Sequence, residues 1–143
     1  MFLTDDAAIA TLALAMIDCS LPKADWTHEG HFAAALWLLR HRPDLATPDA
    51  MRGLIMRYNE ATNTPNTDSS GYHHSITVAS LRAAAHYLAK HAPEIPLHEV
   101  LAALMASPQG RSDWLLVYWR RETLFSVAAR RDWVPPDLAP LTF

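Results

Sequence analysis

Histidines are the side chains of this sequence that are best suited to chemistry. His28 and His31 are three residues apart, a spacing that places them on neighbouring parts of one helical face. A buried imidazole must be hydrogen-bonded or bind something, because an unsatisfied polar group costs about 1–3 kcal/mol in the interior. We therefore expect a site for a base, a metal ion or a polar ligand near these two histidines.

A third histidine, His73, follows the polar segment 68–70. It begins a stripe at helical spacing whose members change from polar to apolar along the chain: Thr77, Ser80, Ala84 and Leu88. The apolar end indicates that this face, and therefore His73, points inward. Near the amino end of a helix the dipole disfavours the imidazolium and leaves a neutral ring as a base or metal ligand.

These residues predict one shared site in which the rings of His28 and His73 converge as catalytic groups. A catalytic zinc-like ion needs three protein ligands and an open position, and the candidate metal ligands are His28, His31, His73 and Asp68. The candidates for binding a small polar ligand are Tyr58, Asn59, Thr77 and Arg121. His74 points about 100° away from His73 around the helix, so it joins the site only if the first turn is distorted.

Simpler roles stay open for several of these side chains. His31 can merely hydrogen-bond a loop carbonyl, and Tyr58 can be a core aromatic residue. Asp68 can be a loop or capping residue, and Arg121 can pair with surface acids. No second histidine completes a zincin motif after His98, and the chain has no Glu-x-x-His pair and no G-x-S-x-G motif.

Prolines and polar loops divide the chain into five main predicted helices. Their approximate ranges are 4–18, 25 or 27 to 41, 48 to the loop at 63–70, 71–91 and 96–106, with short helical turns near 114–119 and 126–131. Thr4 and Thr47 are the predicted N-caps of the first and third helices. Residues 32–39 are apolar on every side, which is typical of a central buried helix.

The predicted fold class is all-α, because no stretch alternates with period two for long enough to form a convincing strand. We expect a compact bundle that forms a single domain over residues 1–143. Trp133, Leu138 and Leu141 give the proline-rich tail apolar surface, so the tail is expected to dock on the bundle.

Composition and charge limit the classes of partner. Of the 143 residues, 50% are hydrophobic and 19% are charged, a balance too apolar for disorder. The net charge of -3 gives no general attraction to nucleic acid, which is not an expected partner. The lone Cys19 cannot form an internal disulfide. The apolar run 7–17 follows acidic residues and is shorter than the roughly 20 residues of a membrane span, so we expect a cytoplasmic protein without membrane association.

Several short motifs together resemble those of an uncharacterised family of small bacterial helical proteins. They are Trp26-Thr27-His28 with His31, Tyr58-Asn59-Glu60, Gly71-Tyr72-His73 with Ile76-Thr77, Leu124-Phe125-Ser126 with Ala129-Arg130-Arg131, and Trp133 with Pro136 to Pro140. The resemblance spans about residues 24–141. The resemblance implies that His28 and His73 act together, but it indicates neither an activity nor a substrate. In that family a glutamate often follows the Gly-Tyr-His motif, where this chain has His74.

Three functions are open at this point. The first is a metal-dependent or acid–base enzyme that acts on a small molecule through His28 and His73. The second is a module that binds a small molecule without transforming it. The third is a structural or interaction protein whose polar cluster ties the loop 63–70 to the core. The reaction, the substrate, the cofactor and the oligomeric state do not follow from the sequence.

Overall fold

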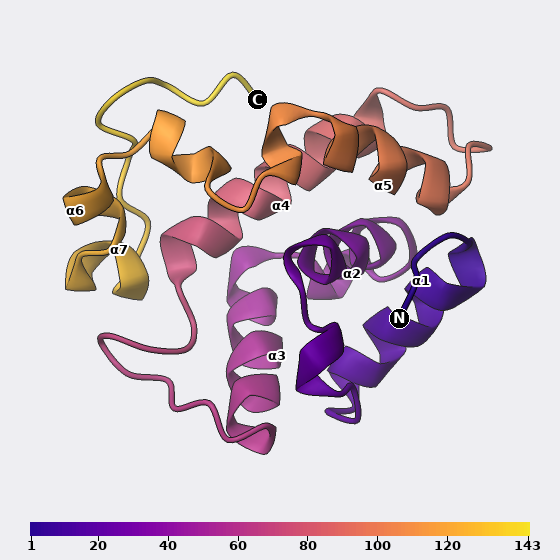
Figure 1. The fold of residues 1–143 in the computed structure, drawn as a ribbon, viewed down its shortest axis with the longest axis horizontal. Helices are drawn as coiled ribbons and strands as arrows, with labels where there is room; N and C mark the ends of the chain where they lie inside the picture. Colours follow the sequence, from indigo (N-terminus) through magenta and orange to yellow (C-terminus); the bar gives the residue numbers. More distant parts are fainter.

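The computed structural model describes residues 1–143 and consists of helices and the loops between them (Figure 1). The predicted all-α class is confirmed. Its α-helices are α1 (Asp6–Ile17), α2 (His28–His41), α3 (Pro48–Ala61), α4 (His74–Ala89), α5 (Leu97–Ala106), α6 (Arg121–Leu124) and α7 (Val127–Arg131). Short 3-10 turns are η1 (Lys23–Asp25), η2 (Pro43–Leu45), η3 (Pro108–Gly110) and η4 (Trp114–Val117). None of the helices combines the length and the apolarity that crossing a membrane requires.

Side-chain caps set where the long helices begin. Thr27 caps α2 and Thr47 caps α3, each through a hydroxyl that accepts a hydrogen bond from a backbone N–H three residues ahead. The first helix differs from the prediction by one residue. Asp5, not Thr4, caps α1, with its carboxylate accepting from the backbone N–H of Ala8 at 2.8 Å. A carboxylate at this position also complements the positive end of the helix dipole.

The fourth helix begins three residues later than predicted, at His74. Gly71 has a φ of +77°, in the left-handed region, and a Cβ there would meet the backbone oxygen of Pro65 at 2.5 Å. Gly71 therefore belongs to a turn that only glycine tolerates, and the helix cannot begin at this residue. His73 becomes the N-cap instead of a residue of the first turn.

Helix α2 is the centre of the core, as its apolar sequence predicts. It contacts α1, α4 and α5, and Figure 1 shows these three helices arranged around it. Phe32, Leu36 and Leu38 are almost completely buried in this helix. Helix α3 contacts α4. The amino-terminal half of α2 lies near both, because residues of all three helices line one cavity.

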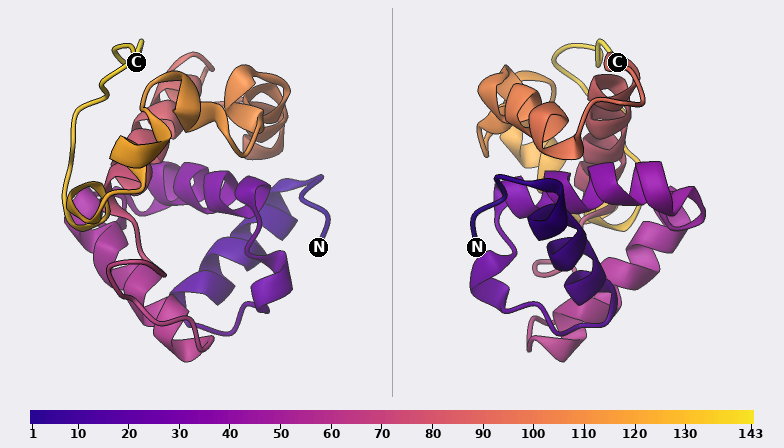
Figure 2. Two further views of the ribbon diagram at one scale, coloured as in Figure 1. Left: turned by 60° about the vertical axis from the view of Figure 1, so that its left-hand side comes forward. Right: turned by 90° about the vertical axis from the view of Figure 1, so that its right-hand side faces the viewer.

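The predicted docking of the tail is confirmed. Figure 2 shows the tail running along the outside of the helices. The indole N–H of Trp119 donates to the carbonyl of Val134 at 3.0 Å, and the backbone N–H of Leu138 donates to the carbonyl of Tyr118 at 2.9 Å. Trp133 packs edge to face against Trp119. The side chain of Leu138 is an exception to the expected burial, since it is 51% exposed.

Ser75 joins the tail to α4, and its removal is expected to lower the stability. Its buried hydroxyl donates to the carbonyl of Asp132 at 2.7 Å and accepts from the backbone N–H of Val134 at 3.0 Å. Ser75→Ala leaves both backbone groups without a partner, so the free energy of unfolding should fall by about 2 kcal/mol. Urea denaturation measures this difference. Ser69→Ala, at an exposed position, should change stability by less than about 0.5 kcal/mol, and equal losses in the two variants would contradict the prediction.

Candidate functional site

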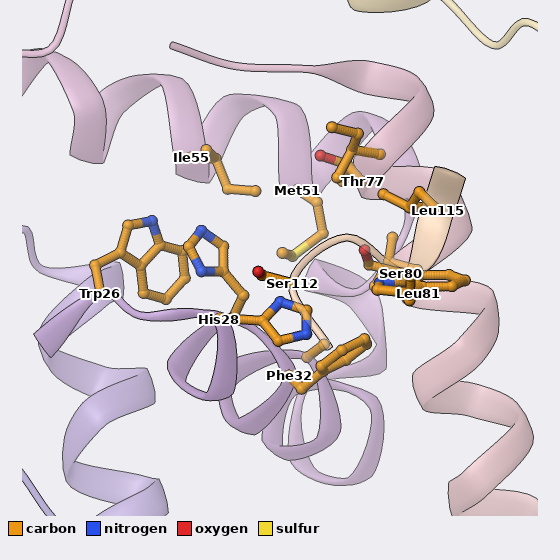
Figure 3. Close-up of a pocket in the computed structure, with 14 residues that line it drawn as sticks. Trp26, His28, Phe32, Met51, Ile55, Thr77, Ser80, Leu81, Ser112 and Leu115 are labelled. Atoms are coloured by element: carbon orange, nitrogen blue, oxygen red, sulfur yellow. The ribbon is translucent and has the colours of Figure 1, made fainter. Parts of the chain in front are cut away.

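A cavity of about 320 Å³ lies between the amino-terminal half of α2, helices α3 and α4, and the chain at 112–115. Figure 3 shows side chains from these elements pointing into one space, with Trp26 and Leu115 on opposite sides. Nine of the fourteen lining residues are hydrophobic. The polar ones are His28, His31, Thr77, Ser80 and Ser112, and no Asp, Glu, Lys or Arg lines the cavity. Its size is within the range of small-molecule sites.

The cap of α2 places two histidines at the cavity. Thr27 accepts a hydrogen bond from the backbone N–H of Gly30 at 3.0 Å, which makes His28 the first residue of the helix. His31 follows one turn later and also lines the cavity. Gly30 allows this turn to lie close to the preceding loop, because a Cβ there would meet the carbonyl oxygen of Asp25 at 2.8 Å.

The hydrogen bond of His28 defines its tautomer. Nε2 of His28 lies 2.8 Å from the backbone oxygen of Gln109. A carbonyl can only accept, so in the neutral ring Nε2 carries the hydrogen and Nδ1 carries the lone pair. Nδ1 has no hydrogen-bond partner in the chain, and this atom is not fully buried. His28 therefore offers a proton-accepting nitrogen at the cavity.

The loop that contains Gln109 is itself held on both sides. The side-chain oxygen of the buried Gln109 accepts from the hydroxyl of Tyr87 at 3.2 Å and from that of Ser107 at 3.0 Å. Gly110 lets the loop approach the end of α5, because a Cβ there would meet the carbonyl oxygen of Met105 at 1.9 Å. The carbonyl that orients His28 is therefore fixed by residues far from His28 in the sequence.

His31 has the opposite tautomer. Its Nδ1 donates to the backbone oxygen of Thr27 at 2.6 Å, which leaves Nε2 as the acceptor. The ring lies against the indole of Trp26, with ring centroids 3.9 Å apart. By surface area the side chain is exposed, because it lines an open cavity, although protein atoms surround most of the ring. This burial lowers the pKa of His31 to about 4; the Thr27 carbonyl opposes the shift, and His28 adds to it.

The lowered pKa of His31 predicts how stability depends on pH. The unfolded chain takes up a proton at this residue below about pH 6.5, its ordinary pKa, whereas the folded chain does so only near pH 4. The unfolded state therefore binds more protons in this window, and the free energy of unfolding should fall as the pH drops through it. His31→Gln should lose less stability than the wild type between pH 7.5 and 4.5. A His31 ring that titrates near its ordinary pKa by NMR would contradict this prediction.

Three hydroxyl groups complete the polar lining. Thr77 lines the cavity and donates its hydroxyl hydrogen to the carbonyl of His73 at 2.9 Å, so its oxygen can only accept further hydrogen bonds. The hydroxyl groups of Ser80 and Ser112 have no hydrogen-bond partner in the chain, so each can still donate and accept a hydrogen bond. Thr77 is thus the one predicted ligand-binding residue that the structure places with His28 and His31.

His73 points inward as predicted, but its two ring nitrogens are already used. Nδ1 accepts from the backbone N–H of Ile76 at 3.2 Å, and Nε2 donates to the carbonyl of Leu124 at 2.6 Å. Burial lowers the pKa of His73, so the neutral ring is favoured. His73 is not among the residues that line the cavity with His28. It caps α4 and binds α6, and the predicted catalytic pairing with His28 gains no support.

His74 also has a partner of its own. Its Nδ1 lies 2.7 Å from the hydroxyl of Tyr72, and both side chains are buried. This contact belongs to the packing at the start of α4 and not to the cavity.

The remaining predicted residues lie outside the cavity. The hydroxyl of Tyr58 is buried and donates to the carbonyl of Leu21, and the amide of Asn59 donates to Asn66 in the following loop. Asp68 forms an exposed ion pair with Arg131, and Arg121 lies over the ring of Phe125. No group of three or more His, Cys, Asp or Glu side chains lies close enough together to hold a metal ion. The four predicted metal ligands are therefore not brought together.

Sequence reasoning missed three contributors to the site. Trp26 belongs to the motif around His28 but was not a candidate site residue, and it forms a cavity wall against His31. Ser112 follows the Pro108–Gly110 break and shows no pattern that distinguishes it from a loop serine. Gln109 acts through its backbone, which no residue type signals.

Comparison with protein families, with curated proteins and with solved structures finds no match to this chain. The resemblance to a family of bacterial helical proteins therefore stays a prediction from the motifs.

Proposed function

We propose that this protein binds a small, largely apolar molecule in the cavity between α2, α3 and α4. The observation that carries the proposal is a cavity of about 320 Å³ with nine hydrophobic lining residues and two imidazoles of defined tautomer. Apolar walls with a few oriented polar groups are typical of small-molecule sites. Each histidine has one nitrogen bound to a backbone carbonyl and the other free for a ligand.

Binding can be tested with 2-naphthol, a neutral two-ring molecule that fits the cavity. Methyl NMR signals of Met51, Ile55 and Leu81 should shift on titration, because these side chains line the cavity. The methyl groups of Val100 and Leu104 are buried outside the cavity and should not shift. Unchanged signals of the lining residues at millimolar 2-naphthol, or shifts spread evenly over the core, would overturn the proposal.

A second candidate function, proton abstraction from a bound substrate, is favoured by the geometry of His28. The Gln109 carbonyl holds the hydrogen on Nε2, so Nδ1 is free to take a proton. The resulting imidazolium would keep its bond to this carbonyl, which stabilises the charged ring. The same arrangement of a base and a group that orients it occurs in acid–base sites in general.

A neutral probe with an acidic C–H bond, 5-nitrobenzisoxazole, tests this role. Nδ1 of His28 would take the proton from C3 while the ring N–O bond breaks, which gives a nitrile and a coloured phenolate. The wild type should form this product about 100-fold faster than His28→Ala. His41 is exposed at the other end of α2, and His41→Ala should react like the wild type. Equal rates for the wild type and His28→Ala would exclude His28 as a base.

A further inference from the structure

From the polar groups that line the cavity, we infer that its ligand is an uncharged molecule that donates a hydrogen bond through an O–H or a ring N–H. This inference rests on the proposed binding function and specifies the chemical class of the ligand. It depends on which hydrogens the chain has already used.

Three polar groups at the cavity can only accept in the neutral protein. Nε2–H of His28 is bound to the Gln109 carbonyl, and Nδ1–H of His31 is bound to the Thr27 carbonyl. The hydroxyl hydrogen of Thr77 is bound to the His73 carbonyl. What these groups offer to a ligand is two imidazole lone pairs and one hydroxyl oxygen. A ligand that brings hydrogen-bond donors therefore complements the cavity.

A carboxylate or phosphate lacks the partners it would need. No Lys or Arg lines the cavity, and neither imidazole has a free N–H to donate. The remaining side-chain donors are the uncharged hydroxyl groups of Ser80 and Ser112. The pKa of about 4 keeps His31 neutral at physiological pH. The amino end of α2 carries a partial positive charge, but Glu29 in its first turn already supplies a negative charge. Two uncharged hydroxyl groups replace only part of the hydration that an anion would lose on entering the cavity.

An ammonium ion is also disfavoured, because the cavity offers no negative charge to pair with it. No Asp or Glu lines the cavity, so a buried cation would have no counter-charge. The face of Trp26 that could contact a cation is next to the ring of His31. An uncharged donor avoids both desolvation penalties and still satisfies the acceptor nitrogens.

Four probes of similar shape separate these ligand classes: 2-naphthol, naphthalene, 2-naphthoate and 2-naphthylmethylammonium. Their dissociation constants at pH 7.5 are measured from the methyl signals of Met51, Ile55 and Leu81. We expect 2-naphthol to bind most tightly, naphthalene about fivefold more weakly, and the two ions at least about tenfold more weakly. If no probe moves these signals, the proposed function fails. If an ion binds as tightly as 2-naphthol, only the ligand class is wrong.

The histidine nitrogens provide a second readout in the unmodified protein. On binding of 2-naphthol, the ¹⁵N signal of the unprotonated nitrogen of His28 or His31 should move upfield, and naphthalene should leave it in place. His28→Phe should reduce the preference for 2-naphthol over naphthalene, whereas His41→Phe, outside the cavity, should preserve it. Equal nitrogen shifts with both probes, or a preference unaffected in His28→Phe and His31→Phe, would overturn the inference.

Discussion

Gly110→Ala is expected to destabilise the protein strongly. The added Cβ would meet the backbone oxygen of Met105 at 1.9 Å and its carbonyl carbon at 2.6 Å. Both atoms belong to the end of α5, so no side chain can rotate away and the loop itself must move. We expect a loss of about 3 kcal/mol in the free energy of unfolding, which for a domain of this size lowers the Tm by about 10 °C.

The same substitution should also disturb the site. Gln109 precedes Gly110, and its carbonyl accepts the Nε2–H of His28. When the loop moves, this hydrogen bond weakens and both neutral tautomers of His28 become populated. The ¹⁵N spectrum of His28 should therefore change in Gly110→Ala, and the affinity for 2-naphthol should decrease.

Gly53→Ala is the matched control. Gly53 lies inside α3, and a Cβ there would have no heavy atom within 4 Å. Alanine in a helix is favoured over glycine by about 0.5–1 kcal/mol, so this variant should be slightly more stable than the wild type. A Gly110→Ala protein as stable as Gly53→Ala would mean that the end of α5 and the loop are not packed as described.

Local signals in the sequence predicted the helices well where the cause is local. Thr27 and Thr47 precede apolar helical patterns, and each caps its helix through a bond to a nearby N–H. The start of α4 was misplaced because a histidine is not a usual cap. His73 takes this role with the help of Leu124, 51 positions away, whose carbonyl holds the other ring nitrogen.

The candidate site was predicted only in part, because one of its decisive contacts also comes from a residue distant in the sequence. The spacing of His28 and His31 indicated a shared face, and both side chains do line one cavity. The partner that orients His28 is a backbone carbonyl 81 positions away, and every residue type carries a carbonyl. Such a contact leaves no trace in residue types, so the sequence favoured His73 as the partner of His28. The structure instead places Thr77, one turn further along α4, beside the cavity.

Two alanines of α2 provide the sharpest test of the cavity as available space. Ala33 is fully buried and does not line the cavity, whereas Ala35 is 4% exposed and does line it. Ala33→Leu forces three extra carbon atoms into close packing and should lower the free energy of unfolding by about 3 kcal/mol. The same atoms at Ala35 can enter a space of about 320 Å³. Their burial contributes about 0.8 kcal/mol per carbon, which offsets the strain, so Ala35→Leu should keep about the wild-type stability.

Ala35→Leu should weaken ligand binding although it leaves the stability nearly unchanged. Leucine at position 35 occupies the volume that 2-naphthol needs, so Ala35→Leu should bind this probe at least about tenfold more weakly than the wild type. A loss of affinity without a loss of stability cannot come from damage to the fold, and therefore reports the filling of the cavity itself. Equal destabilisation of Ala33→Leu and Ala35→Leu, with unchanged binding of 2-naphthol in the second, would show that the probe and the side chain do not share this space.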